Sequence, residues 1–427
     1  MLAILTLAAV PAFAVSEPEA GAEGGPGLAL ISSKILTCAF EGQQVVDNGV
    51  VLVRDGKIER VERYREGIVP DGYEVVDVGD RWLAPGIIEL HCHEAGRSLF
   101  QSNDLNDMVY LTNPELRASS AVEPSNRSMM MARAAGVTTV LYIPGSGTNI
   151  GGQGVTVKTG FDKYEENLVR DPGTLKLAQW GNPESWAVGI SMTFEHWNTR
   201  NTFRRGVGYA KRWRDFEEGK GPEPEFNLQF EVFRDLFNEE IAVATHTQVY
   251  QVVLMTLTMI KGEFNLPVFL DHSTIGGWLD GGLAEEAGVP AICGPRSIDS
   301  LARGMINWAH NGHEGVRGVA AGYQQMGNTM VGFNTDSPVI PQEQLPLQAA
   351  MGVRYGFDDS GLEAVRGLTI VPAKAAHIDH LVGSIEVGKE ADIIVVTGHP
   401  ADPRCGVDKT YIDGRLVYDA ERDGRRW

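Results

Sequence analysis

The 427-residue sequence has few cysteines and no excess of positive charge. Its four cysteines, Cys38, Cys92, Cys293 and Cys405, lie far apart and form no CxxC pair, which argues against a zinc knuckle or a dense disulfide framework. Lysine and arginine number 37 against 56 aspartate and glutamate, giving a formal net charge of −19. Such a charge disfavours attraction to nucleic acid or anionic lipid, so we expect no nucleic-acid partner.

A long hydrophobic run is also missing. The N-terminal stretch MLAILTLAAVPAFA is apolar but too short to span a bilayer comfortably, and no other run approaches that length. It ends in Ala12-Phe13-Ala14 before an acidic Gly/Pro/Ala linker, the pattern of an export signal and its cleavage site, although no Lys or Arg precedes it. We expect residues 1–27 to be a signal peptide and linker, cleaved after Ala14, and the mature protein to be periplasmic or secreted, with no membrane span.

Strand-like patterns occupy both ends of the remaining chain. From Leu28 to about Val78, alternating stretches such as GVVLVRDGKIERV are separated by Gly-containing turns. The stretches GSIEVGKEADIIVVTG and VDKTYIDGRLVYD, near the C-terminus, have the same texture, and Asp413-Gly414 is a hairpin signal. We expect the two ends to pair into one small sheet domain.

Between these ends, apolar runs alternate with helical patterns. Eight strands with intervening helices over roughly 300 residues are typical of a (β/α)8 barrel with insertions. One helix can be predicted with both of its ends, because Ser125 or Asn126 caps its start and Gly136 ends it. The strand candidates are residues 87–90, 138–143, 155–157, 187–192, 241–245, 268–270, 291–293 and 331–333.

Metal-binding side chains follow four of these candidates. The first ends in His91 and His93, which the period of a strand points to one face. His246, His272 and Asp336 stand at the ends of the fifth, sixth and eighth candidates. Imidazole nitrogen and carboxylate oxygen are good ligands for Zn²⁺ or another divalent cation, and an aspartate that touches metal and water can transfer a proton. The pattern predicts a metal site at the mouth of a barrel, with Asp336 as the catalytic acid and base.

Each of these residues also has a purely structural interpretation. His91 and His93 alone fit a pair of surface histidines, and His246 or His272 alone fits a buried core histidine. Asp336 fits a turn signal, because Asp-Ser-Pro forms turns. Four of only ten histidines at predicted strand ends are poorly explained by chance, and this favours the metal site.

The same motifs resemble those of a known family. WLAPGIIELHCH is similar to the first-strand signature of the amidohydrolase superfamily, and GSIEVGKEADIIVVTGHP with TYIDGRLVYD is similar to that family's return into its small β-sandwich. The motifs follow family order and cover nearly the whole chain after the signal, resembling exported or uncharacterised, imidazolonepropionase-like and dipeptidase-like members. The resemblance implies an α/β fold: a distorted (β/α)8 TIM barrel at 83–381, and a small β-sandwich domain from residues 28–82 plus 382–427. It also implies one or two divalent ions held by His91, His93, His246, His272 and Asp336.

Family members with two metals add a bridging Glu or a carboxylated Lys at the end of strand three or four. Here the resemblance implies Glu195, which follows the fourth candidate in WAVGISMTFEHW, with Lys158 at the end of GVTVK as its rival. A solvated loop position is the alternative for Glu195.

The glycine-rich stretch PGSGTNIGGQG lacks the Lys-Ser/Thr of a P-loop and is interpreted as an active-site loop after the second strand.

The resemblance also narrows the reaction. Members that deaminate aromatic rings or open imidazolone-like rings tend to place a Glu three residues after the strand-five histidine, where this chain has Val249. Hydrolysis of amide, cyclic amide or dipeptide C–N bonds in a small-molecule substrate is therefore expected, with Gln248 holding a substrate carbonyl. Arg204 and Arg205 fit either a contact to a substrate carboxylate or phosphate, or the solvated face of a helix. The alternatives are a lactonase or phosphotriesterase-type hydrolase and a metal-binding protein without catalysis. The sequence also allows a homo-oligomer.

Overall fold

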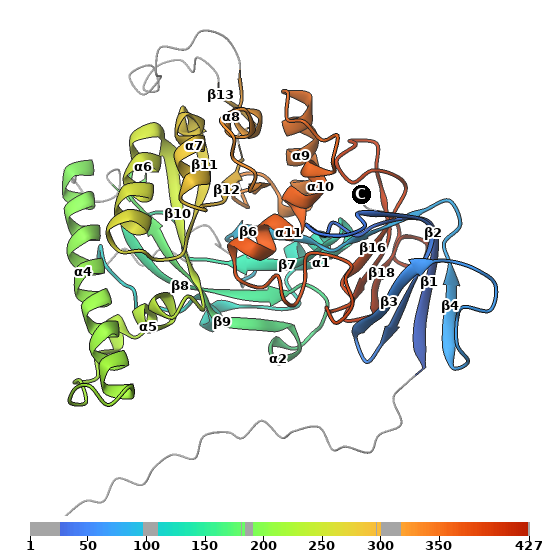
Figure 1. Ribbon diagram of the computed structural model, residues 1–427, viewed down its shortest axis with the longest axis horizontal. Helices are drawn as coiled ribbons and strands as arrows, with labels where there is room; N and C mark the ends of the chain where they lie inside the picture. Colours follow the sequence, from blue (N-terminus) through green and yellow to red (C-terminus); the bar gives the residue numbers. More distant parts are fainter. Residues whose placement is uncertain are drawn as a thin grey trace, which may run out of the picture.

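The computed structural model describes residues 26–96, 110–180, 182–183, 191–295, 297–299 and 317–425 (Figure 1). The expected signal peptide, with its cleavage site after Ala14, lies outside the described residues. Among the helices that are described, none has the length and apolar character needed to cross a membrane.

Both chain ends contribute to one sheet, on the right of Figure 1. The strand order is β18-β17-β16-β5-β1-β2-β3, and β4 pairs with β1. Apolar side chains alternate between two buried clusters, since Val50 and Leu52 of β2 belong to one and Val51 and Val53 to the other. The expected hairpin at Asp413-Gly414 joins β17 to β18. The strands are β1 Gly27–Leu36, β2 Val45–Arg54, β3 Lys57–Arg63, β4 Tyr73–Asp77, β5 Trp82–Pro85, β16 Ile393–Val396, β17 Val407–Ile412 and β18 Arg415–Asp419.

The remaining eight-stranded sheet curves into a nearly closed barrel, in the order β15-β12-β11-β10-β9-β8-β7-β6. Its neighbours are parallel except that β8 is antiparallel to both β7 and β9, which distorts the (β/α)8 pattern. The mixed α/β fold, with a distorted barrel and a second sheet from the chain ends, is confirmed. The strands are β6 Ile87–Cys92, β7 Val137–Tyr142, β8 Ile150–Lys158, β9 Leu168–Ala178, β10 Ala242–Val249, β11 Val268–Ile275, β12 Ala291–Cys293 and β15 Val331–Phe333; a separate pair is β13 Ile298–Asp299 and β14 Arg317–Gly318.

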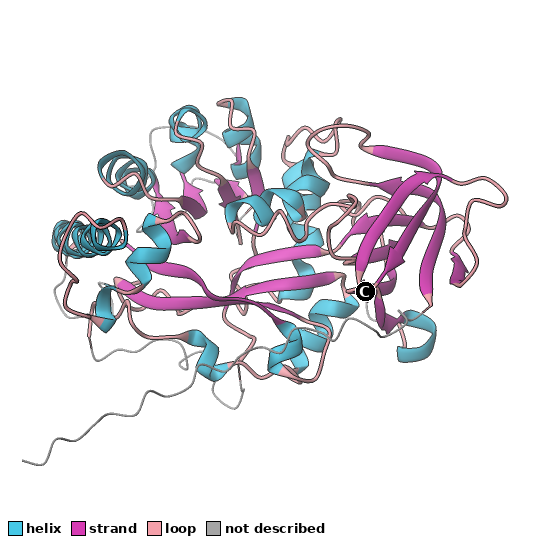
Figure 2. Cartoon of the chain, turned by 60° about the horizontal axis from the view of Figure 1, so that its bottom comes forward, coloured by secondary structure: helices cyan, strands magenta, loops and turns pink. Residues whose placement is uncertain are grey.

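Helices surround the barrel strands, with the second sheet to one side (Figure 2). Asn126 caps α1 by accepting from the Ser128 amide, and Gly136, at φ 83°, follows the helix, as expected. The helices are α1 Arg127–Ala134, α2 Tyr164–Asn167, α4 Met192–Glu217, α5 Val232–Phe237, α6 Tyr250–Met255, α7 Gly281–Glu286, α8 Val319–Gln325, α9 Leu345–Arg354, α10 Glu363–Leu368, α11 Ile370–Ala375 and α12 Ala420–Asp423. Short 3-10 helices are η2 Ala118–Ala121, η3 Leu228–Phe230, η5 Gly277–Asp280 and η6 Gln342–Gln344, and η4 Thr256–Glu263 is a π-helix that continues α6.

One predicted strand has to be replaced. The candidate at 187–192 lies largely outside the described residues, and Met192 begins helix α4. The strand that completes the barrel is β9, LVRDPGTLKLA, whose Asp-Pro-Gly has the composition of a turn. Leu175 and Leu177 pack in the main core, whereas Lys176 points to the opposite face of the strand and is fully buried.

Candidate metal centre

The structure brings together the five side chains that the sequence places at strand ends. The ring centroids of His91 and His272 are 4.3 Å apart, those of His246 and His272 are 4.5 Å apart, and those of His91 and His93 are 5.0 Å apart. Asp336 Oδ1 lies 3.4 Å from His91 Nε2 and 3.5 Å from His93 Nε2, and Oδ2 lies 4.0 Å from His272 Nε2. The carboxyl ends of β6, β10 and β11 and the segment after β15 thus converge on one place.

Hydrogen bonds at Nδ1 orient three of the imidazoles. His246 Nδ1 lies 3.0 Å from Ser146 Oγ, His272 Nδ1 lies 2.9 Å from the Gly294 carbonyl, and His93 Nδ1 lies 2.9 Å from a carbonyl just after β7. Ser146 comes from the PGSGTNIGGQG loop, which therefore reaches the site as expected. A histidine fixed through Nδ1 presents Nε2 to the site, as metal-binding histidines commonly do.

These imidazoles suit a divalent cation. Among the residues that the structure describes, the buried Nε2 atoms of His246 and His272 have no hydrogen-bond partner, an arrangement that costs free energy unless a ligand fills it. Burial lowers the pKa of His91 and His246 well below the ordinary value and that of His272 to about 4, so all three are neutral, as metal ligands must be. Two groups have ligand atoms within 4.8 Å of one another: His91, His246 and His272, and His91, His93 and Asp336.

Asp336 lies in a left-handed backbone conformation, with φ 50°, three residues after β15. Burial acts to raise the pKa of its carboxyl group, but His272 and His93 outweigh burial and hold the pKa well below its usual range. The carboxylate is therefore ionised and can accept a proton at neutral pH.

Lys176 is a site residue that the sequence interpretation missed. It stands near the carboxyl end of β9, its Nζ lies 3.0 Å from His91 Nε2, and burial lowers its pKa to about 8. Alternation with Leu175 and Leu177 gives the appearance of a solvent-facing lysine. The sequence did contain a signal for this residue: Lys176 lies between two leucines near the end of a barrel strand, where a side chain can reach the site.

The two bridging residues inferred from the sequence stand on elements other than those that carry the clustered side chains. Glu195 is in the first turn of α4 rather than at a strand end, and it belongs to neither group of clustered ligand atoms. Lys158 does end β8, but this strand is antiparallel to β7, so its end lies at the opposite edge of the sheet. There Lys158 pairs with Glu390 at 2.7 Å, with Asp392 at 3.0 Å and with Asp413.

Two residues after His246, Gln248 is half-buried near the carboxyl end of β10, where the pairing with β11 is irregular between Thr247 and Val249. Val249 is buried in an apolar cluster with Val252 and Ile275. The position that carries a proton-transferring Glu in ring-deaminating members is thus part of a hydrophobic wall.

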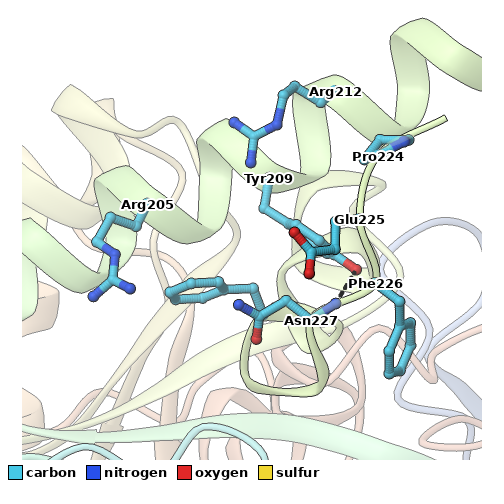
Figure 3. Close-up of a pocket in the computed structure, with 8 residues that line it drawn as sticks. Arg205, Tyr209, Arg212, Pro224, Glu225, Phe226 and Asn227 are labelled. Carbon is cyan, nitrogen blue, oxygen red and sulfur yellow. Dashed lines mark hydrogen bonds between the residues drawn. The ribbon is translucent and has the colours of Figure 1, made fainter. Parts of the chain in front are cut away.

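The arginines proposed to meet a substrate are on the exposed face of α4. Arg204 forms an ion pair with Glu263 at 3.0 Å. Arg205 stacks on Phe230 and lines a surface pocket of about 550 Å³ (Figure 3). None of the five clustered residues lines this pocket, so the structure favours the solvated-helix alternative for both arginines. The lining residues are Arg205, Tyr209, Arg212, Pro224, Glu225, Phe226, Asn227 and Phe230.

Comparisons with known proteins agree with the geometry. Residues 278–417 match the model of the amidohydrolase family. Over 412 residues, 88% of this chain, the sequence is 23% identical to amidohydrolase tasK of Hapsidospora irregularis, and over 146 residues, 30% of this chain, it is 31% identical to imidazolonepropionase of Hyphomonas neptunium. The chain spans only 40% and 34% of the length of these two curated relatives.

Solved structures extend the similarity across the fold. A crystal structure of an amidohydrolase from Thermotoga maritima superposes with a TM-score of 0.78 at 25% identity, covering 92% of this chain and 100% of that one. A Xaa-Pro dipeptidase superposes with a TM-score of 0.53 at 16% identity, covering 92% and 100%, which supports the fold alone. The signature at the first barrel strand, the converging histidines and these similarities agree in relating the chain to the amidohydrolase superfamily.

Proposed function

We propose that this protein is a metal-dependent hydrolase that cleaves amide, cyclic amide or dipeptide C–N bonds of a small molecule. The observation that carries the proposal is the convergence of four buried or half-buried histidines and Asp336 on one place, with unpartnered Nε2 atoms on His246 and His272. The names of the relatives, an amidohydrolase and an imidazolonepropionase, support the same bond class.

The residues of the site can hold one or two divalent ions, such as Zn²⁺. His91, His246 and His272 form one group, and His91, His93 and Asp336 form the other. A divalent cation bound there lowers the pKa of a water ligand towards neutrality and polarises a substrate carbonyl.

Lys176 is the side chain placed to join the two groups. Its lowered pKa, about 8, keeps a fraction of the buried amine neutral at neutral pH. A neutral amine can add to carbon dioxide and release a proton, which yields an N-carboxylate beside His91. This would supply the bridging carboxylate that the resemblance implies, in place of Glu195 or Lys158.

Asp336 performs the proton transfer. Its ionised carboxylate accepts a proton from the attacking water and later delivers it to the leaving nitrogen, the role of a general base followed by a general acid. Val249 offers no such group, which favours a single shuttle at Asp336 over the two-residue chemistry of ring deamination.

The test is hydrolysis by metal-loaded protein with Asp336→Asn as the comparison. The panel comprises dipeptides, N-acyl amino acids, cyclic amides, lactones and phosphotriesters. We expect wild type to cleave a C–N substrate and Asp336→Asn to lose about 10² to 10⁴ in kcat while keeping its fold and most of its metal. Elemental analysis should find one or two ions per chain in wild type, and His91→Ala should lose metal and activity together.

The panel also separates the alternatives. Selective cleavage of lactones or phosphotriesters would assign the metal centre to that chemistry instead. A protein that binds no zinc or manganese when supplied with either would contradict the proposal, and so would equal rates for wild type and Asp336→Asn.

A further inference from the structure

No regular strand pairing closes the barrel sheet where its first and last described strands meet. β15 and β6 lie at the two ends of the strand order, and among the described residues one isolated bridge, between Cys92 and Ser337, joins the two segments. The metal centre straddles this seam, because His91 and His93 lie on one side and Asp336 on the other. Whatever holds the seam therefore sets the distance between Asp336 and the two histidines.

Glu89 crosses the seam two residues before His91. Its side chain is completely buried, and its Oε1 accepts the amide hydrogen of His91 at 2.8 Å. Its Oε2 accepts both the amide hydrogen of Thr335, at 2.9 Å, and the Thr335 hydroxyl, at 2.6 Å. One carboxylate thus binds the backbone of His91 and the residue just before Asp336.

Glu94 crosses the seam one residue after His93. Its Oε2 accepts hydrogen bonds from the hydroxyl of Ser337 and, at 3.2 Å, from that of Ser128. The His93 amide donates to the Ser337 carbonyl at 2.9 Å. The residue just after Asp336 is therefore held by the segment that carries His93.

We propose that Glu89 and Glu94 are positioning residues, which hold Asp336 opposite His91 and His93 by binding its two chain neighbours. Together with Thr335 and Ser337 they form what we call the seam clamp. The clamp also accounts for the left-handed conformation of Asp336, because a non-glycine residue persists there when its surroundings fix it. The consequence for metal binding rests on the proposed function, whereas the clamp itself does not.

The role proposed for Glu89 rests on its two acceptor oxygens. Both of its oxygens accept N–H groups, so a Glu89→Gln amide must turn its NH₂ either towards the His91 amide or towards the Thr335 amide. A donor then faces a donor, and one arm of the clamp opens. Partners that orient metal ligands typically account for about 10- to 100-fold in metal affinity or activity.

The chain offers a control with the same threonine contacts at an exposed position. Glu285 also accepts the amide and the hydroxyl of one threonine, Thr329, at 2.8 Å and 3.0 Å. Thr329 lies just before β15, whereas Thr335 follows it, so Glu285→Gln makes the same chemical change at the start of the strand, away from Asp336.

The first test uses metal-free protein and hydrogen exchange read by mass spectrometry. We expect Glu89→Gln to speed exchange about tenfold or more in peptides covering residues 87–93 and 331–337, and Glu285→Gln to leave both peptides unchanged. Unchanged exchange at 331–337 in Glu89→Gln would overturn the clamp, whatever the protein binds. If Glu89→Gln does not fold, Glu94→Ala and Ser337→Ala open the second arm and decide the question by the same measurement.

The second test measures zinc affinity by competition with a chromophoric chelator, and then kcat and KM. We expect Glu89→Gln to weaken zinc binding about 10- to 100-fold and to lower kcat more than it raises KM, with Glu285→Gln within about twofold of wild type. Equal changes in zinc affinity and kcat in the two variants would show that Glu89 only stabilises the fold, and would overturn its positioning role. A wild-type protein that binds no zinc would refute the proposed function alone, since the exchange test stands without metal.

Discussion

At the scale of single residues, the site depends on backbone conformations that most side chains avoid. His272, Ser273 and Asp336 have φ values of 69°, 54° and 50°, and all three lie at or beside the proposed metal centre. Such conformations cost about 1–3 kcal/mol each and persist where surrounding contacts fix them. For Asp336 those contacts come from its neighbours Thr335 and Ser337. Side-chain chemistry alone therefore identifies the ligands, but their placement comes from hydrogen bonds of residues beside them.

Lys176 allows a direct test at the same scale. Lys176→Met keeps the length and burial of the side chain but removes the amine next to His91. If wild type binds two ions in bicarbonate buffer, we expect Lys176→Met to bind about one, because it cannot form the bridging N-carboxylate. Elemental analysis of the purified variants measures the count.

Glu195→Gln is the comparison, since Glu195 lies outside both groups of ligand atoms. We expect it to keep the wild-type count. If the number of bound ions falls in Glu195→Gln but not in Lys176→Met, the bridging residue is Glu195, as first inferred from the sequence.

At the scale of elements, the apolar patterns locate strands better than they give strand direction. Alternation and apolar runs identify β6, β7, β10 and β11, and hence the histidines that follow them. They do not identify β9, because Asp171-Pro172-Gly173 has turn composition and Lys176 is polar within a buried face. Nor can they show that β8 is antiparallel, since side chains alternate with a period of two in either direction. This is why Lys158 was placed at the mouth of the barrel, although it lies at the opposite edge.

Lys158 joins β8 to the sheet of the chain ends. Its Nζ pairs with Glu390, Asp392 and Asp413, which flank β16 and β17. Burial acts to lower the pKa of Lys158, but Asp392, Asp413 and Glu390 outweigh burial and raise the pKa above its usual value. The stabilisation is therefore fully present at neutral pH and is lost only as the pH rises through that raised pKa.

We expect Lys158→Met to lower the free energy of unfolding by about 3–5 kcal/mol, because it leaves the buried Asp392 without its cation. Denaturant unfolding followed by circular dichroism measures the loss. Lys374→Met, which removes an exposed ion pair to Asp379, should cost no more than about 1 kcal/mol. Comparable losses in the two variants would show that the buried cluster contributes no more than a surface pair.

At the scale of the whole molecule, the sheet formed by the chain ends helps to fix the position of the proposed metal centre. β5 ends at Pro85 and β6 begins at Ile87, so Gly86 alone separates the second sheet from the strand that carries His91. A Cβ on Gly86 would lie 2.1 Å from the Thr138 hydroxyl oxygen, and this close approach requires glycine. The C-terminal strand β16 pairs with β5, so both chain ends support the start of β6.

The cysteines of the folded chain are free and mostly buried. All four are free, Cys38, Cys92 and Cys293 are buried, and burial raises the pKa of the Cys38 thiol to about 12. Buried thiols with raised pKa values react slowly, because the thiolate is the reactive form. These three buried thiols are therefore expected to react slowly with oxidants and alkylating agents.

We propose, on the A-x-A pattern at Ala12-Phe13-Ala14, that the chain is exported and cleaved after Ala14. Cleavage there would leave residues 15–26 ahead of β1, which begins at Gly27 and pairs with β2, so the sheet would stay intact. N-terminal sequencing of protein from the periplasm or medium of the native host should begin at Val15. Ala14→Leu should block cleavage, because signal peptidases require a small residue there, whereas Ala9→Leu, within the apolar stretch, should not. An uncleaved chain recovered only from the cytoplasm would refute export while leaving the metal centre and its proposed chemistry unaffected.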